Sequence, residues 1–283
     1  MSRSPTFLRP SSLDEAVGQL VEYAGGARVL AGSTALTIML RQGLIEPAAL
    51  VMLAGIAGLD EIVREDGHVK IGALVTHRGA ERSEELAGSM PVLADTFAKV
   101  ANVRVRNQAT VGGVLAEADY ASDPPAVFVG LGAEIEAYGP DGARAIPAGE
   151  FFHAFYETAL EPNEVLTAVR VPVPAPGTAA VYKKYVSRSS EDRPCVGVFA
   201  SAGPEGVRVV VGAAAETPQR FPELEERAAG GLDSGSIAAV ADGYAESIET
   251  LEDMRGSAWY RTEMVRVWVR RALTEVAEQL GSA

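Results

Sequence analysis

Two short stretches of the chain combine glycine with hydroxyl-bearing residues, a pattern that suits anion binding. Glycine allows positive φ and close backbone approach, and successive backbone N–H groups at such a turn can bind phosphate oxygens. Two loops of this kind in one chain predict a pyrophosphate held from both sides, as in a dinucleotide cofactor. The first loop is Ala31, Gly32, Ser33, Thr34, Ala35 and Leu36, and the second runs from Arg106 to Thr110, Val111, Gly112 and Gly113.

The second loop gives the stronger signal, because Gly112 and Gly113 can bring two amides against an anion and Thr110 adds a hydroxyl. Asp123 lies downstream, where a carboxylate could accept hydrogen bonds from ribose hydroxyls. Structural alternatives remain open. Each glycine loop could be only a tight turn, and Asp123 could be a helix N-cap before Pro124. A capping aspartate can also face a ligand, so the two interpretations of Asp123 are compatible.

Lys184 and Cys195 are two further candidates for chemistry. Successive strand residues point to opposite faces, so Lys184 should face away from Lys183, which better suits a solvated strand edge. Cys195 is the only cysteine and precedes an apolar stretch. This favours a buried small side chain over a redox role, because no second cysteine could resolve an oxidised one.

The composition limits the function classes. The 283 residues are 47% hydrophobic and 22% charged, which is typical of a globular protein with two or three packed units. The net charge of −13 argues against nonspecific binding to nucleic acid or acidic membranes. One cysteine excludes an intrachain disulfide and a four-cysteine iron–sulfur cluster, and the three histidines lack metal-ligand spacing. With no signal-peptide core and no membrane-length apolar run, we expect a cytoplasmic protein without a membrane span or a metal site.

The N-terminal half must position the two loops. Residues 12–15 form a capping-box pattern at the start of a helix, and 27–31 reads as a strand entering the first loop. The sequence pattern changes from residue 58 onward. The Gly-x-Gly at 130–132 lacks the following helix of a dinucleotide-binding fingerprint, so it predicts a turn. We expect helices at 36–40 and 91–100, a helix or strand at 124–131, and strands at 50–54, 59–63, 68–75, 134–138 and 164–171, with turns at 65–67 and 139–142.

The C-terminal third begins after a proline-rich linker at 172–177. Three strands, at 180–185, 196–202 and 207–214, precede two helices. The apolar stripe of the last helix indicates core packing rather than a partner-docking face. The stripe comprises Val265, Trp268, Ala272, Val276 and Leu280.

These motifs together resemble the FAD-binding medium subunit of molybdenum hydroxylases, the family of carbon monoxide dehydrogenase and xanthine dehydrogenase. The resemblance runs nearly from end to end, and its most specific part is Val105 to Gly113 followed by Ala116, Asp119, Asp123 and Pro125. Supporting stretches are 7–16, 28–34, 71–77, 164–172, 259–261 and 269–273.

The resemblance implies an α+β fold: a two-lobed FAD-binding domain of the vanillyl-alcohol-oxidase type, with lobes at 1–57 and 58–173. A small α+β C-terminal domain with a three-stranded antiparallel sheet would follow at 178–283. FAD would bind noncovalently, with Ala31 to Leu36 and Thr110 to Gly113 on the pyrophosphate and Asp123 on the adenosine ribose. Leu166 and Ala101 would pack near the flavin or adenine, and Lys184 would reach toward the flavin ring.

The same resemblance implies an electron-transfer subunit with no catalytic acid or base of its own. Molybdopterin would lie on a large partner subunit and two [2Fe–2S] clusters on a small one, in a dimer of heterotrimers. The chain departs from the family pattern at Ser33, where many relatives have glycine, at Glu117 and Tyr120, and around 187–194. The alternatives are a self-contained flavoenzyme of the same fold, similar to UDP-N-acetylenolpyruvoylglucosamine reductase, and a noncatalytic nucleotide-binding scaffold.

Overall fold

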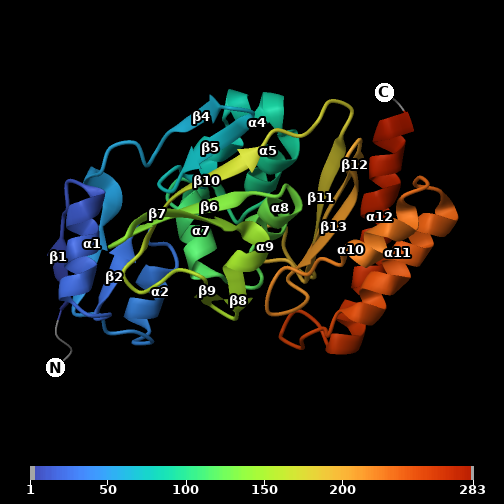
Figure 1. The fold of residues 1–283 in the computed structure, drawn as a ribbon. Helices are drawn as coiled ribbons and strands as arrows, with labels where there is room; N and C mark the ends of the chain where they lie inside the picture. Colours follow the sequence, from blue (N-terminus) through green and yellow to red (C-terminus); the bar gives the residue numbers. More distant parts are fainter. Residues whose placement is uncertain (1–3, 282–283) are drawn as a thin grey trace.

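Three main sheets, each of three or more strands, follow one another along the molecule (Figure 1). The structure is a computed structural model that describes residues 4–281. A small parallel sheet at the N-terminus is followed by a five-stranded antiparallel sheet and then by a three-stranded antiparallel sheet backed by two long helices. We call them the N-terminal, central and C-terminal sheets. This mixed α/β architecture, with a three-stranded antiparallel sheet and helices at its C-terminal end, confirms the predicted fold class.

The N-terminal sheet has the order β1-β3-β2, with all strands parallel. Helix α1 contacts β2 and β3 on one side and β6 and β10 of the central sheet on the other. Half of the predicted capping box is present, because the Ser12 hydroxyl accepts from the Glu15 amide at 3.2 Å, whereas the Glu15 carboxylate accepts from the Ser11 amide rather than from that of Ser12. The elements are β1 (Thr6–Leu8), α1 (Leu13–Glu22), β2 (Ala27–Leu30), α2 (Leu36–Arg41), β3 (Ala49–Met52) and the 3₁₀ turn η1 (Leu53–Gly55).

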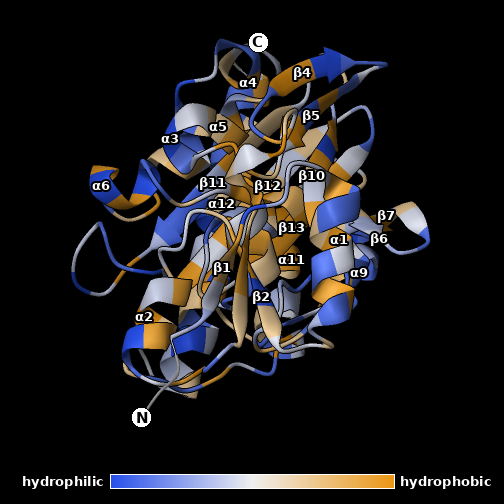
Figure 2. Ribbon diagram, turned by 90° about the vertical axis from the view of Figure 1, so that its left-hand side faces the viewer, coloured by the Kyte–Doolittle hydropathy of each residue, from blue (hydrophilic) through white to orange (hydrophobic). Residues whose placement is uncertain are grey.

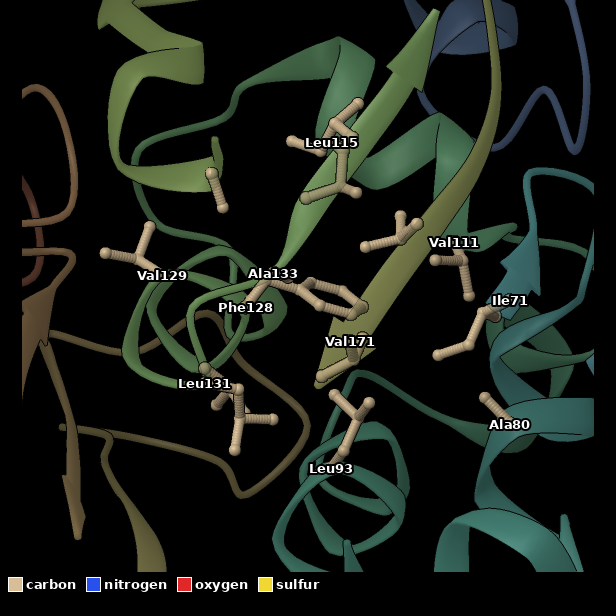
Figure 3. Packing of buried hydrophobic residues seen from close by; sticks show 14 of the residues in the cluster. Ile71, Ala80, Leu93, Val111, Leu115, Phe128, Val129, Leu131, Ala133 and Val171 are labelled. Atoms are coloured by element: carbon tan, nitrogen blue, oxygen red, sulfur yellow. The ribbon is translucent and has the colours of Figure 1, made fainter. Parts of the chain in front are cut away.

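The central sheet has the order β4-β5-β10-β6-β7, with β10 in the middle. Figure 3 shows side chains of α5, α7, α8 and β10 converging in its core, among them Leu93, Val111, Phe128 and Val171. Its strands are β4 (Ile62–Glu65), β5 (His68–Gly72), β6 (Glu134–Gly139), β7 (Gly142–Pro147) and β10 (Val165–Pro172). The helices are α3 (His77–Glu81), α4 (Glu84–Ser89), α5 (Pro91–Ala98), α6 (Val103–Arg106), α7 (Val111–Glu117), α8 (Pro124–Gly130) and α9 (Ala148–Phe151), and β8 (Phe152–Ala154) pairs with β9 (Glu157–Thr158).

The C-terminal sheet, β11-β12-β13, lies between α8 of the central part and the helices α11 and α12. Tyr182, Phe199 and Val210 of this sheet belong to the central core, whereas Val198 and Val209 pack with the helices. Among residues 4–281 no helix is both long and apolar enough to cross a membrane. The elements are β11 (Ala179–Tyr185), β12 (Val196–Gly203), β13 (Gly206–Gly212), α10 (Pro222–Glu225), the 3₁₀ turn η2 (Glu226–Ala228), α11 (Ser234–Ser247) and α12 (Ala258–Gly281).

Hydropathy follows this layering. Figure 2 shows hydrophobic segments gathered in the interior strands and hydrophilic ones on outer turns and loops. The segment 124–131, for which the sequence predicted either a helix or a strand, forms the helix α8, in which every residue is buried. Cys195 is buried and free, as expected from its apolar surroundings.

Several predicted elements need correction. The strand predicted at 59–63 runs instead from Ile62 to Glu65, and the one predicted at 68–75 ends at Gly72, where a turn begins. The turn at 139–142 leads into β7, a strand that the sequence pattern does not reveal, because Ile146 is its only buried side chain. The strand at 50–54 ends at Met52 and gives way to η1. On α12, Leu280 is 37% exposed, since the helix turns this position out of the core. The buried residues of α12 are Arg261, Val265, Val269, Ala272, Leu273 and Val276.

Candidate functional site

The first loop leaves the carboxyl end of β2 and touches the second loop through Gly32. A Cβ on Gly32 would lie 1.9 Å from the carbonyl oxygen of Gln108 and 3.1 Å from the Cα of Ala109. Only glycine permits this approach of two backbones. The structure therefore brings together the two loops that the sequence singled out, although they are separated by about seventy residues.

The first loop presents its backbone to solvent. Ala31 to Leu36 are all half-buried, and Ser33 has φ of +60°, the left-handed conformation that favours glycine. Within residues 4–281, the amides of Gly32 through Leu36 have no hydrogen-bond acceptor. Such open, successive N–H groups are suited to oxygen atoms of a phosphate.

The second loop is more internally bonded than its sequence suggests. The amides of Val111 and Gly112 donate to the carbonyls of Val75 and Ala73, at 2.9 and 2.8 Å. The Gly113 amide donates to the Thr110 hydroxyl at 3.1 Å, which caps α7. A Cβ on Gly112 would lie 2.6 Å from the Ala73 Cβ, so this glycine allows α7 to pack closely against the turn that follows β5. Gly113 is half-buried and offers a ligand a surface without a side chain.

Asp123 and Lys184 form a buried ion pair. The Lys184 ammonium lies 2.9 Å from Asp123 Oδ2, and the two side chains are 7% and 4% exposed. The Tyr182 hydroxyl donates to Asp123 Oδ1 at 2.8 Å. Burial raises the pKa of the Asp123 carboxyl, and the Lys184 ammonium opposes that shift. Asp123 does precede α8, but its side chain makes no capping hydrogen bond, because Tyr182 and Lys184 occupy it.

Lys184 faces away from Lys183, as strand alternation predicts. Lys183 pairs with Glu275 on α12, whereas Lys184 pairs with Asp123 and donates to the Lys99 carbonyl at 2.8 Å. Both lysines are among the residues that line a cleft. An ammonium has three N–H donors, and Asp123 and Lys99 accept two of them. Since no third acceptor occurs in the described part of the chain, one donor remains for a ligand in the cleft.

The cleft has a volume of about 750 Å³, within the range of small-molecule sites. It lies between the segment that joins α5 to α6 and the connection from β11 to β12. Ala101, at φ of +43°, lines it. Arg106 holds this turn by donating to the carbonyls of Val100 and Ala101 at 3.0 and 2.9 Å, and the Glu81 carboxylate accepts from its Nε at 2.9 Å.

The predicted site residues thus fall into two groups and one outlier. Gly32 of the first loop meets the second loop. Lys184 and Ala101 line the cleft, and Asp123 is buried behind its lining as the ion-pair partner of Lys184. Leu166 is buried on β10 in the central core and is not part of the cleft lining. Tyr182 and Lys99 take part in this site, although the sequence pattern did not predict them. The pattern could have indicated Tyr182, because it lies two residues before Lys184 and hence on the same strand face.

A second polar cluster surrounds the end of α7. The buried Asp119 carboxylate accepts from the Ala121 amide at 3.0 Å and pairs with Arg193 of the β11–β12 connection at 2.6 Å. Burial, assisted by the negative charge of Asp119, raises the pKa of Glu117 to about 7. Tyr120 donates to Asp253 Oδ2 at 2.7 Å, which links this cluster to the C-terminal part.

Comparisons with known proteins agree over nearly the whole chain. Residues 3–174 match the family "FAD binding domain in molybdopterin dehydrogenase", and residues 182–276 match the "CO dehydrogenase flavoprotein C-terminal domain". The carbon monoxide dehydrogenase medium chain of Afipia carboxidovorans is 35% identical, over 94% of each chain. The solved carbon monoxide dehydrogenase of Hydrogenophaga pseudoflava superposes with a TM-score of 0.94 at 31% identity, and quinoline 2-oxidoreductase of Pseudomonas putida with 0.92 at 28%, each covering 99% of both chains.

Fold and site thus define a flavoprotein of the FAD-dependent oxidoreductases. More specifically, the chain belongs to the family of FAD-binding medium subunits of molybdenum hydroxylases. Its residues fit this cofactor. The backbone contact at Gly32 and the open amides beside it suit a pyrophosphate. The cleft has room for a ring and contains a buried lysine with a free donor.

Proposed function

We propose that FAD binds noncovalently along the first loop, over Gly113 of the second loop and into the cleft. The pyrophosphate would lie against the amides of Gly32 to Leu36, and the second loop, Thr110 to Gly113, would contribute close backbone surface. The observation that supports this most strongly is the contact of Gly32 with Gln108, because it joins the two loops beside open amides. Bound FAD supplies the redox chemistry, since it accepts and releases electrons.

The remaining predicted contacts involve the flavin ring and the adenosine ribose, whose predicted partners Lys184 and Asp123 form one ion pair. Lys184 offers one free N–H and a positive charge to a flavin ring in the cleft, and Ala101 presents a small side chain there. Asp123 supports Lys184, and any contact of its carboxylate with a ribose would have to share oxygens with Tyr182 and Lys184. Leu166 would contribute only apolar packing from the core. We propose that the chain binds and tunes the cofactor, and that it carries no catalytic acid or base of its own.

We further propose that the chain transfers electrons within a cytoplasmic complex. A large molybdopterin subunit would oxidise the substrate, a small subunit with [2Fe–2S] clusters would pass electrons to FAD, and the complex would be a dimer of heterotrimers. Relatives that are named medium chains support this proposal. Their match over nearly the full length favours it over a self-contained reductase or a nucleotide-binding scaffold.

The proposed domains are the FAD-binding lobes at 1–57 and 58–173 and the C-terminal domain at 178–283. The parallel N-terminal sheet falls in the first lobe and the antiparallel central sheet in the second. The irregular segment between β10 and β11 lies at the last boundary.

FAD binding to the purified chain tests the proposal. We expect reconstitution with FAD to give a yellow protein that retains flavin through gel filtration. The Gly32→Ala variant should bind FAD about tenfold more weakly or worse. The reason is that overpacking costs about 1–3 kcal/mol, and each 1.4 kcal/mol is about tenfold in affinity.

Gly18→Ala is the matched control. A Cβ on Gly18, in α1, meets nothing within 4 Å, so this variant should retain full affinity. No flavin bound by the wild-type chain, or equal affinities of Gly32→Ala and Gly18→Ala, would contradict the proposal. In the native host, a molybdopterin subunit and an iron–sulfur subunit should co-purify with the chain.

A further inference from the structure

Tyr182 is a buried residue whose hydroxyl forms a hydrogen bond with Asp123. It is 3% exposed on β11, and its hydroxyl donates to Asp123 Oδ1 at 2.8 Å. The neighbouring strand makes room for it, because a Cβ on Gly197 would lie 2.2 Å from the Tyr182 oxygen. Burial, reinforced by the negative charge of Asp123, raises the pKa of Tyr182 well above its ordinary value, so the phenol remains a donor.

The backbone of Tyr182 is also held by a hydrogen bond from Lys99, which lies on the other side of the cleft from β11. Lys99, which directly follows α5, donates from Nζ to the Tyr182 carbonyl at 2.8 Å. The Lys99 carbonyl in turn accepts from Lys184 Nζ at 2.8 Å. Tyr182, Lys99, Lys184 and Asp123 therefore form a closed ring of contacts between the FAD-binding part and the C-terminal sheet.

The charges of this ring determine what Lys184 presents to the cleft. Asp123 is the negative partner of Lys184, and the Tyr182 hydroxyl stabilises its charge and fixes Oδ2 toward the ammonium. A hydrogen bond to a charged group contributes about 1.5–3 kcal/mol. Without the phenol, Asp123 is less compensated, and the potential in the cleft becomes more negative.

We propose that Tyr182 is a positioning residue that sets the reduction potential of FAD by controlling the Asp123–Lys184 ion pair. The inference rests on the proposed binding of FAD in the cleft. Electrons added to a flavin are stabilised by positive charge nearby and destabilised by negative charge. Tyr182 therefore favours reduction, and its loss should disfavour it.

The test is Tyr182→Phe in the FAD-loaded chain, with the midpoint potential and the FAD affinity measured separately. We expect Tyr182→Phe to lower the ratio of reduced to oxidised FAD about threefold to tenfold at a fixed applied potential, as the loss of part of a charged hydrogen bond implies. Asp123→Asn should raise the same ratio. Tyr138→Phe is the matched control, because Tyr138 donates to Asp14 between β6 and α1, outside the cleft. It should leave the ratio unchanged.

The double variant decides whether Tyr182 acts through Asp123. In the Asp123→Asn background, Tyr182→Phe should no longer lower the ratio. An unchanged potential in Tyr182→Phe with FAD bound, or an equal shift in both backgrounds, would overturn the inference while leaving FAD binding intact. A wild-type chain that takes up no FAD would instead overturn the proposed function itself. If Tyr182→Phe does not fold, an unchanged ratio in Asp123→Asn overturns the inference and a raised ratio supports it.

Discussion

Asp123 shows how far a single residue can be interpreted from sequence. The motif around it predicts a functional carboxylate that binds a ligand or caps a helix. Its actual partners, Tyr182 and Lys184, lie 59 and 61 residues away along the chain. The spacing of residues near Asp123 cannot show which distant strand packs against its carboxylate. The Asp123–Lys184 ion pair could therefore be identified only from the three-dimensional structure.

Glu117 allows a prediction about pH. Its folded pKa of about 7 exceeds its ordinary 4.5, so the protonated form is favoured in the folded state. Its contribution to stability is therefore complete below about pH 4.5 and lost as the pH rises through about 7. Since one pKa unit is about 1.4 kcal/mol and partial exposure screens the effect, we expect Glu117→Gln to be about 1–3 kcal/mol more stable than wild type at pH 8.

Denaturant unfolding at pH 5 and pH 8 measures this difference. Glu117→Gln and wild type should differ little at pH 5 and diverge by pH 8. Glu157→Gln serves as the control, because Glu157 is exposed on β9 and such surface changes are usually within about 0.5 kcal/mol. A stability gap for Glu117→Gln that is the same at both pH values would show that burial of Glu117 does not govern its ionisation.

Among the elements, the strand–loop–helix unit from β2 to α2 was predictable because its pattern is local. The sequence shows an apolar run, then a glycine, then apolar residues at helical spacing. These features predict the ends of β2 and α2 to within a residue or two. The strand β7 was not predictable, since its outward side chains resemble those of a loop. The contact of Gly32 with Gln108 could not be predicted either. A glycine in a sequence indicates an unusual backbone conformation or a close contact, but it does not show which residue makes that contact.

The backbone of this loop leads to a prediction at Ser33. Its φ of +60° costs an L-residue about 1–2 kcal/mol, so Ser33→Gly should keep FAD affinity within about threefold and raise the melting temperature. Ser33→Val should lower both, because a β-branched residue is strained at positive φ. Flavin titration and thermal unfolding measure the two effects. A large loss of affinity in Ser33→Gly would mean that the hydroxyl, rather than the open amides, holds the cofactor.

At the scale of the whole molecule, the C-terminal sheet is a shared layer. One face contributes Tyr182, Phe199 and Val210 to the central core, and the other packs on α11 and α12. The sequence predicted the three strands and the helices, but apolar residues on both faces of β12 do not show which partner covers each face. That assignment depends on the close packing of α8 against β12 and β13. The cleft that we propose for the flavin is bordered by both parts.

This shared layer predicts one cooperative unfolding transition for the whole chain, which Gly130→Ala should weaken. Gly130 ends α8, and a Cβ there would lie 2.1 Å from Cδ1 of Phe199 on β12. Since overpacking a core costs about 1–3 kcal/mol, Gly130→Ala should lower the stability of both parts together in calorimetry. Gly88→Ala in α4, where a Cβ meets nothing within 4 Å, should be neutral or up to about 1 kcal/mol stabilising. Two separate transitions in Gly130→Ala, with only one of them shifted, would show instead that the C-terminal part folds on its own and that its contact with α8 adds little to either stability.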